Sequence, residues 1–409
     1  MPRIKPFQAI RPTPTAAADV ASVPYDVVNR EEAVELAKGN PSSFLHVVRP
    51  DIDLPPETDP YSADVYRTGR DNLDRLIREG TLIRDAVDSL YVYRQVMNGM
   101  AQSGVVCCCH IDDYENNLIL KHEKTRQSKE DDRTRHVLAL NAHAGPVFLT
   151  YRDVAAVDAL VAAECAQTPL YDFTAVDGVQ HTVWTVKDPQ AIVELLSAVP
   201  AFYVADGHHR SASAWRAGAE RRAANPNHTG DEEYNWFLTV LFPAQQLHIL
   251  SYNRIIRDLN GLTAGQFIER LSSLGHLEPT SQPVPEHEGS FCFYLDGAWY
   301  RLTVPPDSID RSDAIASLDV AILEERVLGP IFGIQDVRTD SRIDFVGGIR
   351  GTQELEKRVN SGDWACAVSM YPTSIQQLMA VSDAGQIMPP KSTWFEPKLR
   401  SGLLVHSLD

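Results

Sequence analysis

The 409-residue sequence lacks the short motifs that define several large enzyme classes. It has no Gly-x-x-x-x-Gly-Lys-Ser/Thr loop, which excludes a P-loop NTPase. It has neither His-Glu-x-x-His nor Gly-x-Ser-x-Gly, so zincin and α/β-hydrolase chemistry have no basis in the sequence. Its six cysteines form no Cys-x-x-Cys pair, which argues against a zinc ribbon or a thioredoxin-like site.

The sequence also lacks long apolar runs and any excess of positive charge. No stretch reaches the apolar length of a membrane helix, and residues 1–6 carry no signal-peptide core, so we expect a cytoplasmic protein without a membrane partner. The 38 basic residues are outnumbered by 55 acidic ones, which gives a net charge of −17. Because nucleic-acid binding requires Lys and Arg to neutralise phosphates, we expect no nucleic-acid partner. A small anion in a local positive pocket is compatible with this charge.

The order of the expected elements predicts an α/β (α+β) fold with mixed sheets. From about residue 150, strands over 181–186, 201–205 and 236–242 alternate with helices over 189–197 and 211–224. This alternation indicates at least one crossover unit on a partly parallel sheet. Boundaries near 155 and 260 divide the chain into an N-terminal α/β region (1–155), a phosphate-binding core (156–260) and a C-terminal α/β region (261–409).

Two hairpins are expected outside the alternating region. Residues 89–97 and 104–111 flank Asn98-Gly99, a pair that favours a two-residue hairpin turn. A second hairpin is expected around Asp296-Gly297. In the first hairpin, the run Cys107-Cys108-Cys109 is interpreted as small buried strand residues rather than a redox or metal site.

The segment Ala201–Ser211 carries the strongest functional pattern in the chain. An apolar strand ends at Asp206, Gly207 allows the backbone to turn and approach a ligand, and a helix follows. The free N–H groups and the dipole of this helix favour an anion, and Arg210 can hold two phosphate oxygens. Asp206 is expected either to cap the helix or to bind a magnesium ion that bridges phosphate oxygens.

A purely structural interpretation of the same turn stays open. Asp206 would then only cap the helix, and Arg210 would make a surface ion pair. His208 and His209 would form a hydrogen-bonded turn. Because all of these residues stand in a row at a strand-to-helix junction, we favour the anion site over this alternative.

Two further clusters carry charged groups suited to the same ligand. Glu123 lies among cations at an expected strand end, where it is either a general base or one charge on a solvated face. In residues 388–398, prolines and aromatic residues frame Lys391 and Lys398. These two lysines either point at an anion or belong to a tail that crosses the surface.

The turn resembles that of the ParB/sulfiredoxin-like superfamily, whose members bind nucleotide phosphates there. As a whole, the chain resembles a bacterial and archaeal family of unknown function labelled SpoOJ/ParA/ParB/RepB-like. Three stretches carry this resemblance: Lys121–Thr125, Ala205–Arg210 and Pro389–Leu399. The resemblance implies mixed sheets with a ParB/sulfiredoxin-like core over 156–260, flanked by additional N- and C-terminal α/β regions.

Three activities occur within this superfamily. Chromosome-partition proteins bind nucleotide and DNA, but they carry a helix-turn-helix and a basic surface that are not recognisable in this acidic sequence. Sulfiredoxin needs a cysteine inside its turn, where this chain has His208. Archaeal free-serine kinases share the Asp-Gly-His-His-Arg form of the turn. These kinases transfer phosphate between a nucleotide and serine with an acidic base and magnesium, and the resemblance to them covers the core around residues 180–245.

The resemblance to free-serine kinases implies a small-molecule phosphotransferase that uses Mg²⁺ and ATP or ADP, with L-serine as the leading acceptor. Catalysis would then rest on positioning and charge stabilisation. The residues expected to bind the nucleotide or its metal are Asp206, Gly207, His208, His209, Arg210, Ser211 and Lys398, with Asp206 next to the metal. The residues expected in catalysis are Glu123 as the first candidate base, Asp26 as the second, His209 and Lys391.

A nucleotide-binding regulatory protein with little or no catalysis is the alternative to the kinase hypothesis. This alternative requires the same turn, but it predicts that the loss of Glu123 or Asp26 has no effect on the protein's function. The sequence leaves the nucleotide, the acceptor and the direction of the reaction open. It also leaves the oligomeric state open, with a homodimer as one option.

Overall fold

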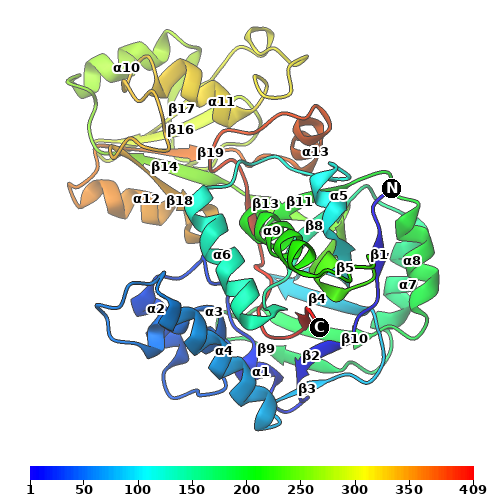
Figure 1. Cartoon of the computed structure of the whole chain (residues 1–409). Coiled ribbons are helices and arrows are strands. Elements are labelled where there is room, and N and C mark those ends of the chain that lie inside the picture. The colour runs from blue at the N-terminus through cyan, green and yellow to red at the C-terminus, as the bar shows by residue number, and fades with distance from the viewer. The chain divides into compact units, whose positions relative to one another are not determined.

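The computed structural model describes all of residues 1–409 and divides them into two compact units (Figure 1). Unit 1 comprises Met1–Leu247 together with Pro397–Asp409, and unit 2 comprises His248–Glu396. Each unit combines helices with β-sheets, which confirms the expected α/β class. No helix has both the length and the apolar composition needed to cross a membrane.

Unit 1 consists of two sheets and the helices that pack on them. Its strands are β1 (Ile4–Lys5), β2 (Ala9–Pro12), β3 (Leu82–Arg84), β4 (Tyr91–Met97), β5 (Met100–His110), β6 (Ile119–Leu120), β7 (Ala142–His143), β8 (Val147–Tyr151), β9 (Tyr171–Thr174), β10 (Gln180–Thr185), β11 (Phe202–Asp206), β12 (Trp236–Pro243) and β21 (Val405–Ser407). Its α-helices are α1 (Ala17–Val20), α2 (Arg30–Ala37), α3 (Leu45–Val48), α4 (Ala63–Arg78), α5 (Ile111–Glu115), α6 (Gln127–Leu140), α7 (Ala155–Cys165), α8 (Pro189–Ser197) and α9 (His208–Ala224). Short 3₁₀ segments are η1 (Pro50–Asp53), η2 (Glu233–Asn235) and η3 (Ala244–Gln246).

A nine-stranded mixed sheet forms the centre of unit 1. Its main order is β6-β11-β8-β12-β5-β4-β10-β9, and β1 pairs with β5. β11 runs parallel to β6 and β12 runs parallel to β8, while the other neighbours are antiparallel. The sheet is therefore partly parallel, as the alternating pattern predicted.

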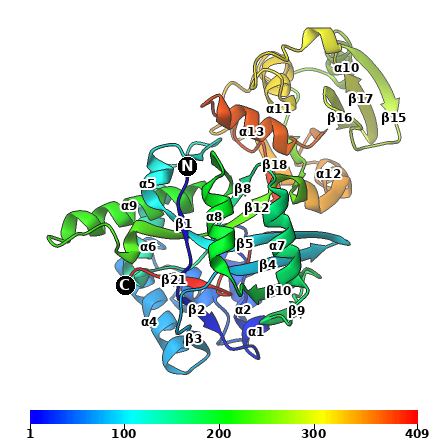
Figure 2. The same cartoon turned by 90° about the vertical axis from the view of Figure 1, so that its right-hand side faces the viewer.

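The central sheet is covered by helices and buried. α9 packs against α6, which also packs against α4, and α7 packs against α8 (Figures 1 and 2). All residues of β8 are buried, and Cys107, Cys108 and Cys109 on β5 are fully inaccessible to solvent. The Sγ atoms of Cys107 and Cys109 lie 3.4 and 3.3 Å from the Thr239 hydroxyl. These cysteines are core residues, as expected.

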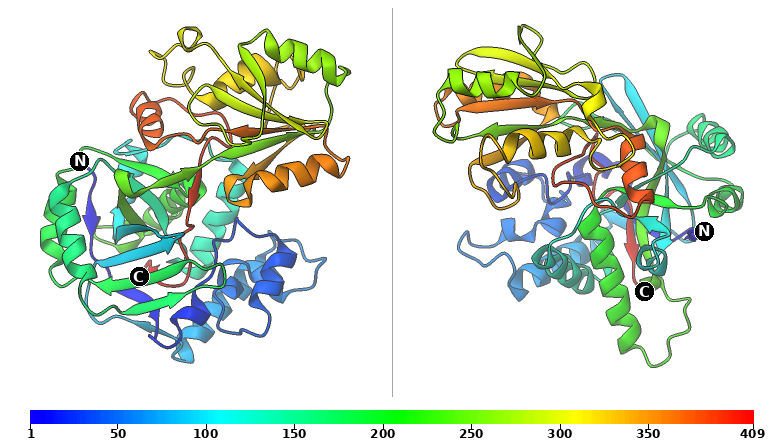
Figure 3. Two further views of the ribbon diagram at one scale, coloured as in Figure 1. Left: turned by 180° about the vertical axis from the view of Figure 1, so that it is seen from behind. Right: turned by 90° about the horizontal axis from the view of Figure 1, so that it is seen from above.

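The last residues of the chain return to unit 1 and join its second sheet. This sheet has the order β3-β2-β21-β7, so β21 pairs with two strands from distant parts of the sequence. Figure 3 shows the C-terminal segment, in red, ending among the blue and green elements of unit 1. Because Pro397–Asp409 belongs to this unit, Lys398 shares a unit with the predicted turn.

Unit 2 is built around a six-stranded antiparallel sheet of order β15-β17-β16-β19-β14-β18, with β13 and β20 as a separate pair. Its strands are β13 (His248–Leu250), β14 (Tyr252–Ile256), β15 (His276–Thr280), β16 (Ser290–Leu295), β17 (Ala298–Thr303), β18 (Ile343–Gly347), β19 (Cys366–Met370) and β20 (Trp394–Glu396). Its α-helices are α10 (Ala264–Ser272), α11 (Asp319–Leu323), α12 (Gly351–Asn360) and α13 (Ile375–Asp383). Shorter segments are the 3₁₀ turns η4 (Pro306–Ser308) and η6 (Gly348–Arg350) and the π-helical η5 (Glu324–Leu328).

Locally encoded elements agree closely with the sequence pattern. The helix expected over 189–197 is α8, and the expected hairpins are the pairs β4–β5 and β16–β17. Asn98 and Asp296, the first residues of the two hairpin turns, both have positive φ, as a type I′ turn requires. The turn residues therefore fix these hairpins by their own backbone preferences.

The division into units differs from the expected boundaries near 155 and 260. β4 and β5 precede residue 155, but they pair with β10 and β12, which follow it, so no boundary falls there. The observed change of unit lies between Leu247 and His248. Pairing between strands far apart in sequence leaves no mark on local composition, so the pattern along the chain did not reveal it.

The close packing of α9 supplies a stability prediction. Gly218 lies on the buried face of this helix, where an added Cβ would come under 3.0 Å from the Tyr234 carbonyl oxygen and from Ile111. Because a backbone carbonyl cannot move aside easily, we expect Gly218→Ala to reduce the free energy of unfolding by about 1–3 kcal/mol.

Urea unfolding of the wild type and the variant measures this change. Gly265 in α10 is the matched control, because a Cβ there meets no atom within 4 Å. Gly265→Ala should cause no loss and can add up to about 1 kcal/mol through helix propensity. Equal behaviour of the two variants would contradict the packing argument.

Candidate functional site

The predicted turn lies at the end of β11 and opens directly into α9. Gly207 has a φ of +97°, a left-handed conformation that side-chain-bearing residues rarely adopt. Gly207 is itself the N-cap of α9, and no side chain caps the helix. Of the two alternatives for Asp206, capping of the helix is therefore ruled out, and its role at a magnesium ion stays a prediction. The first N–H groups of α9 lack intrahelical partners and carry the positive end of the helix dipole.

Two cations converge on Asp206, the last residue of β11. Lys398 Nζ lies 3.7 Å and Arg210 Nη2 lies 3.2 Å from Asp206 Oδ2. Burial alone raises the pKa of this carboxyl group, but Lys398 and Arg210 outweigh burial and hold the pKa well below its usual range. Asp206 is therefore ionised, and it fixes Lys398 beside the turn.

Arg210 supports the turn from inside the protein. Its Nη1 donates to the Pro146 carbonyl oxygen and its Nη2 donates to Asp206, so much of its donor fork is occupied. Its guanidinium also packs beneath Gly207, where an added Cβ would lie 3.2 Å from Arg210 Nε. Burial lowers the pKa of Arg210, but Asp26 and Asp206 more than offset this and leave the pKa raised. The positive charge of Arg210 therefore acts on the turn from its buried side.

Ser211 is also used within the protein. Its hydroxyl is buried and donates to the Gly207 carbonyl oxygen at 3.2 Å. The side chain thus stabilises the turn internally, while the role predicted for Ser211 in phosphate binding stays a prediction.

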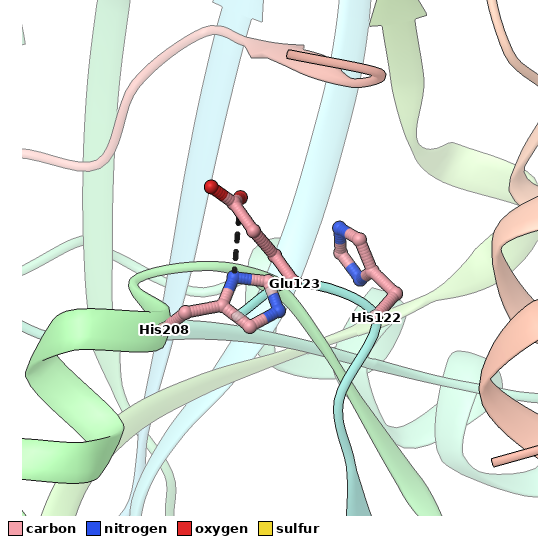
Figure 4. A group of neighbouring side chains, drawn as sticks. All are labelled: His122, Glu123 and His208. Carbon is pink, nitrogen blue, oxygen red and sulfur yellow. Dashed lines mark ion pairs between the residues drawn. The ribbon is translucent and has the colours of Figure 1, made fainter. Parts of the chain in front are cut away.

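His208, the first residue of α9, faces a segment that lies far away in the sequence. Figure 4 shows its ring close to the side chains of His122 and Glu123, which follow β6. The Nδ1 atom of His208 is 3.9 Å from Glu123 Oε2, and the rings of His208 and His122 meet edge to face with centroids 4.4 Å apart. One ligand atom from each residue lies within 4.8 Å of the others. We call this group the His–Glu–His cluster.

The two histidines of the cluster are buried and uncharged at neutral pH. Burial lowers the pKa of His122 to about 4. Burial and the neighbouring His122 hold the pKa of His208 well below its usual range. The side chain of Glu123 is 44% exposed, so the cluster combines two enclosed imidazoles with a carboxylate that reaches solvent.

The second histidine of the turn, His209, connects α9 to the loop after the cluster. Its Nε2 accepts a hydrogen bond from the Arg126 backbone N–H at 3.1 Å. Burial lowers the pKa of His209, and the charge of Asp26 opposes this shift only in part. Asp26 is exposed in the turn after Pro24, and its charge acts on both His209 and Arg210. The structure therefore brings both candidate bases, Glu123 and Asp26, to the surroundings of the turn.

The two predicted lysines fall in different units. Lys398 is mostly buried, and its carbonyl oxygen accepts a hydrogen bond from Gln95 at 2.8 Å. Lys391 belongs to unit 2, where its amine lies 5.4 Å from the Tyr252 ring centre and its carbonyl accepts from Arg254. The catalytic role predicted for Lys391 stays a prediction.

A comparison with protein families decides which group the chain belongs to. Residues 4–321 match the family described as a protein of unknown function, DUF1015. The chain belongs to the DUF1015 family. A search of curated proteins gives no match.

Solved structures give distant likenesses to this DUF1015 protein. A conserved hypothetical protein from Pyrococcus furiosus is 11% identical, with 73% of this chain and 93% of that chain covered and a TM-score of 0.35. Free serine kinase in complex with AMP is 11% identical, with 74% and 91% covered and a TM-score of 0.35. C-terminally truncated SbnI from Staphylococcus aureus is 12% identical, with 73% and 86% covered and a TM-score of 0.40.

The sequence alone did not identify two residues near the turn. It gave His122 no role of its own within the charged stretch around Glu123, and Arg133 lies on α6, a helix that was not predicted. Arg133 lines a small cavity behind the turn together with Tyr25 and Arg210. The adjacency of His122 to Glu123 was a usable signal, whereas no local pattern marks Arg133 because folding alone brings α6 next to α9.

Proposed function

We propose that this protein transfers a phosphoryl group between a nucleotide, ATP or ADP, and the hydroxyl group of a small metabolite, with L-serine as the leading candidate. The observation that carries the proposal is the uncapped start of α9 behind Gly207, with Lys398 at its side. A strand that ends in a glycine turn before a helix N-terminus is a recurring phosphate-binding arrangement. The ParB/sulfiredoxin-like character of this core is part of the proposal.

The phosphates of the nucleotide would lie on the first backbone N–H groups of α9. Gly207 supplies the left-handed backbone that lets the helix begin directly after β11, and the helix dipole favours negative charge there. Lys398, held beside the turn by Asp206, would supply a positive charge, and Arg210 would add its charge from the buried side of the turn. Phosphoryl transfer depends on such charge stabilisation more than on covalent participation of the protein.

The acceptor is proposed to carry a carboxylate as well as a hydroxyl. The cavity behind the turn is lined by Arg133 and Arg210, and the buried Arg210 Nε–H has no hydrogen-bond acceptor. A carboxylate would satisfy that donor, while the guanidinium charges are already paired, Arg133 with Asp132 and Arg210 with Asp206. A hydroxylated amino acid meets both requirements.

A carboxylate of the protein would orient the acceptor hydroxyl and take its proton as the oxygen attacks the terminal phosphorus. Glu123 and Asp26 are the two candidates, because both lie near the turn and both reach solvent. Magnesium would neutralise phosphate oxygens when bound. Asp206, whose Oδ2 already pairs with two cations, would offer it the other oxygen.

Phosphorus NMR of the purified protein with Mg²⁺, L-serine and either ATP or ADP tests the proposal. We expect a phosphoserine resonance that grows with time from ATP, or that falls when phosphoserine and ADP are supplied. Nucleotide binding without any acceptor-linked phosphate would favour the regulatory alternative or a different acceptor. Failure to bind nucleotide would overturn the assignment of the turn.

Substitution of the two carboxylates identifies the base. The true base, changed to its amide in Asp26→Asn or Glu123→Gln, should reduce kcat by about 10²–10⁴-fold. Nucleotide affinity, measured by calorimetry, should change little in the same variant, because the phosphates rest on α9. Retention of full turnover by both variants would contradict a carboxylate base at this site.

A further inference from the structure

Phosphoryl transfer uses Glu123 at most as a base and gives no task to the buried imidazole of His122 beside it. We propose that the His–Glu–His cluster of His122, Glu123 and His208 binds one divalent first-row transition-metal ion, of which Zn²⁺ is the representative. This site is distinct from the magnesium ion of a nucleotide complex. The proposal does not depend on the proposed phosphotransferase activity.

The donor atoms lie at a spacing that a metal ion can close. The three candidate ligand atoms are within 4.8 Å of one another. Ligands that share a tetrahedral zinc ion at about 2.0–2.1 Å are roughly 3.3 Å apart, so the group must contract by about 1.5 Å. The side chain of Glu123 is half-exposed and can move toward the ion, whereas the two histidines are buried.

The two imidazoles are already held in a state suited to metal binding. The backbone of Val204 hydrogen-bonds to the His122 ring, which orients it in the way that metal-bound histidines are usually oriented. His208 Nε2 is buried and has no hydrogen-bond partner. Buried polar atoms are rarely left so, and an ion bound to Nε2, rather than to the Nδ1 that faces Glu123, would satisfy this atom.

The donor set decides the class of ion. Mg²⁺ and Ca²⁺ prefer oxygen ligands throughout, whereas two imidazole nitrogens with one carboxylate suit Zn²⁺, Mn²⁺ or Fe²⁺. Three protein ligands leave a coordination position open to an external oxygen ligand. A consequence for the reaction follows: a metal-bound Glu123 is not a free base, so Asp26 would take the proton.

Metal binding can be measured directly on the full chain without nucleotide. The purified protein, first stripped with chelator, is titrated with Zn²⁺ by calorimetry and with Co²⁺ by visible absorption. We expect one equivalent to bind and the Co²⁺ complex to show the intense bands of a low-coordinate site. His208→Ala and His122→Ala should weaken Zn²⁺ binding by about 100-fold or more, since even outer-shell changes cost 10–100-fold.

Matched variants keep this test decisive. His276 and Glu278 form an exposed His–Glu pair at 3.5 Å, so His276→Gln tests whether such a pair alone binds the ion, and its affinity should equal that of the wild type. His208→Gln is a milder replacement, and unfolding curves without metal identify any variant that has lost its fold. Absence of stoichiometric binding by the wild type overturns the proposal, as does wild-type Zn²⁺ affinity in folded His208→Gln.

Discussion

Gly207→Ala should reduce nucleotide affinity by at least about 100-fold while leaving most of the protein folded. The residue has a φ of +97°, which costs a non-glycine residue about 1–3 kcal/mol. The new Cβ would also lie 3.2 and 3.3 Å from Nε and Cζ of Arg210, the guanidinium that supports the turn. The backbone must therefore shift at the point where the phosphates are proposed to bind. Calorimetry with ADP measures the loss.

Gly230→Ala is the matched control for this substitution. Gly230 has a φ of +106°, so an alanine there carries a similar backbone strain, but its Cβ would meet nothing within 4 Å. We expect a comparable loss of stability with unchanged nucleotide affinity. If Gly207→Ala binds ADP as tightly as Gly230→Ala does, the glycine turn is not the phosphate site.

Acid should destabilise unit 1 strongly between pH 6.5 and 4.5. Burial lowers the pKa of His136 to about 3 and, with Arg400 nearby, the pKa of His181 to about 3. Both rings are also tied into hydrogen bonds, His136 to the Val47 carbonyl oxygen and His181 to Tyr93 and Arg400. The folded protein therefore holds these histidines in the uncharged form.

The sign of the effect follows from proton linkage. Below the unfolded-state pKa of about 6.5, these histidines are protonated in the unfolded chain but stay uncharged in the folded chain. The free energy of unfolding is therefore highest above that pH and falls as the pH drops below it. At pH 4.5 each of these two histidines contributes a loss of about 2–3 kcal/mol, a large share of a typical folding free energy of about 5–15 kcal/mol. The buried pair His143 and His406, whose pKa values burial also lowers, acts in the same direction.

Denaturant unfolding at several pH values from 7.5 to 4.5 measures this loss. His136→Gln removes one titrating group and keeps a side-chain donor for Val47, so its stability should depend less steeply on pH. His287 is exposed, and His287→Gln should keep the wild-type slope. A stability that is flat across this window would show that the buried histidines do not control acid unfolding.

The sequence predicted the turn because its signals are local. Strand, glycine and helix follow one another within residues 201–224, and each is encoded by its own side chains. α2 is also encoded by its own side chains, because Asn29 and Glu32 form a capping box at its start. The sequence did not show the internal hydrogen bonds of these side chains: Arg210 donates to the Pro146 carbonyl oxygen and Ser211 to the Gly207 carbonyl oxygen.

The sequence by itself determined many of the local elements, the glycine turn between strand and helix and the exclusion of several enzyme classes, since these depend on composition and neighbouring residues. Only the tertiary structure decided which groups meet. It brought His122 and Glu123 to His208 across more than 80 positions, and it brought Lys398 from the end of the chain to Asp206. The physical reason is that the sheet of unit 1 pairs strands that are distant in sequence. This pairing also determines where the helices that pack on the sheet lie, and so which of their side chains meet. Such pairings gain their energy from shared burial, which no local pattern encodes.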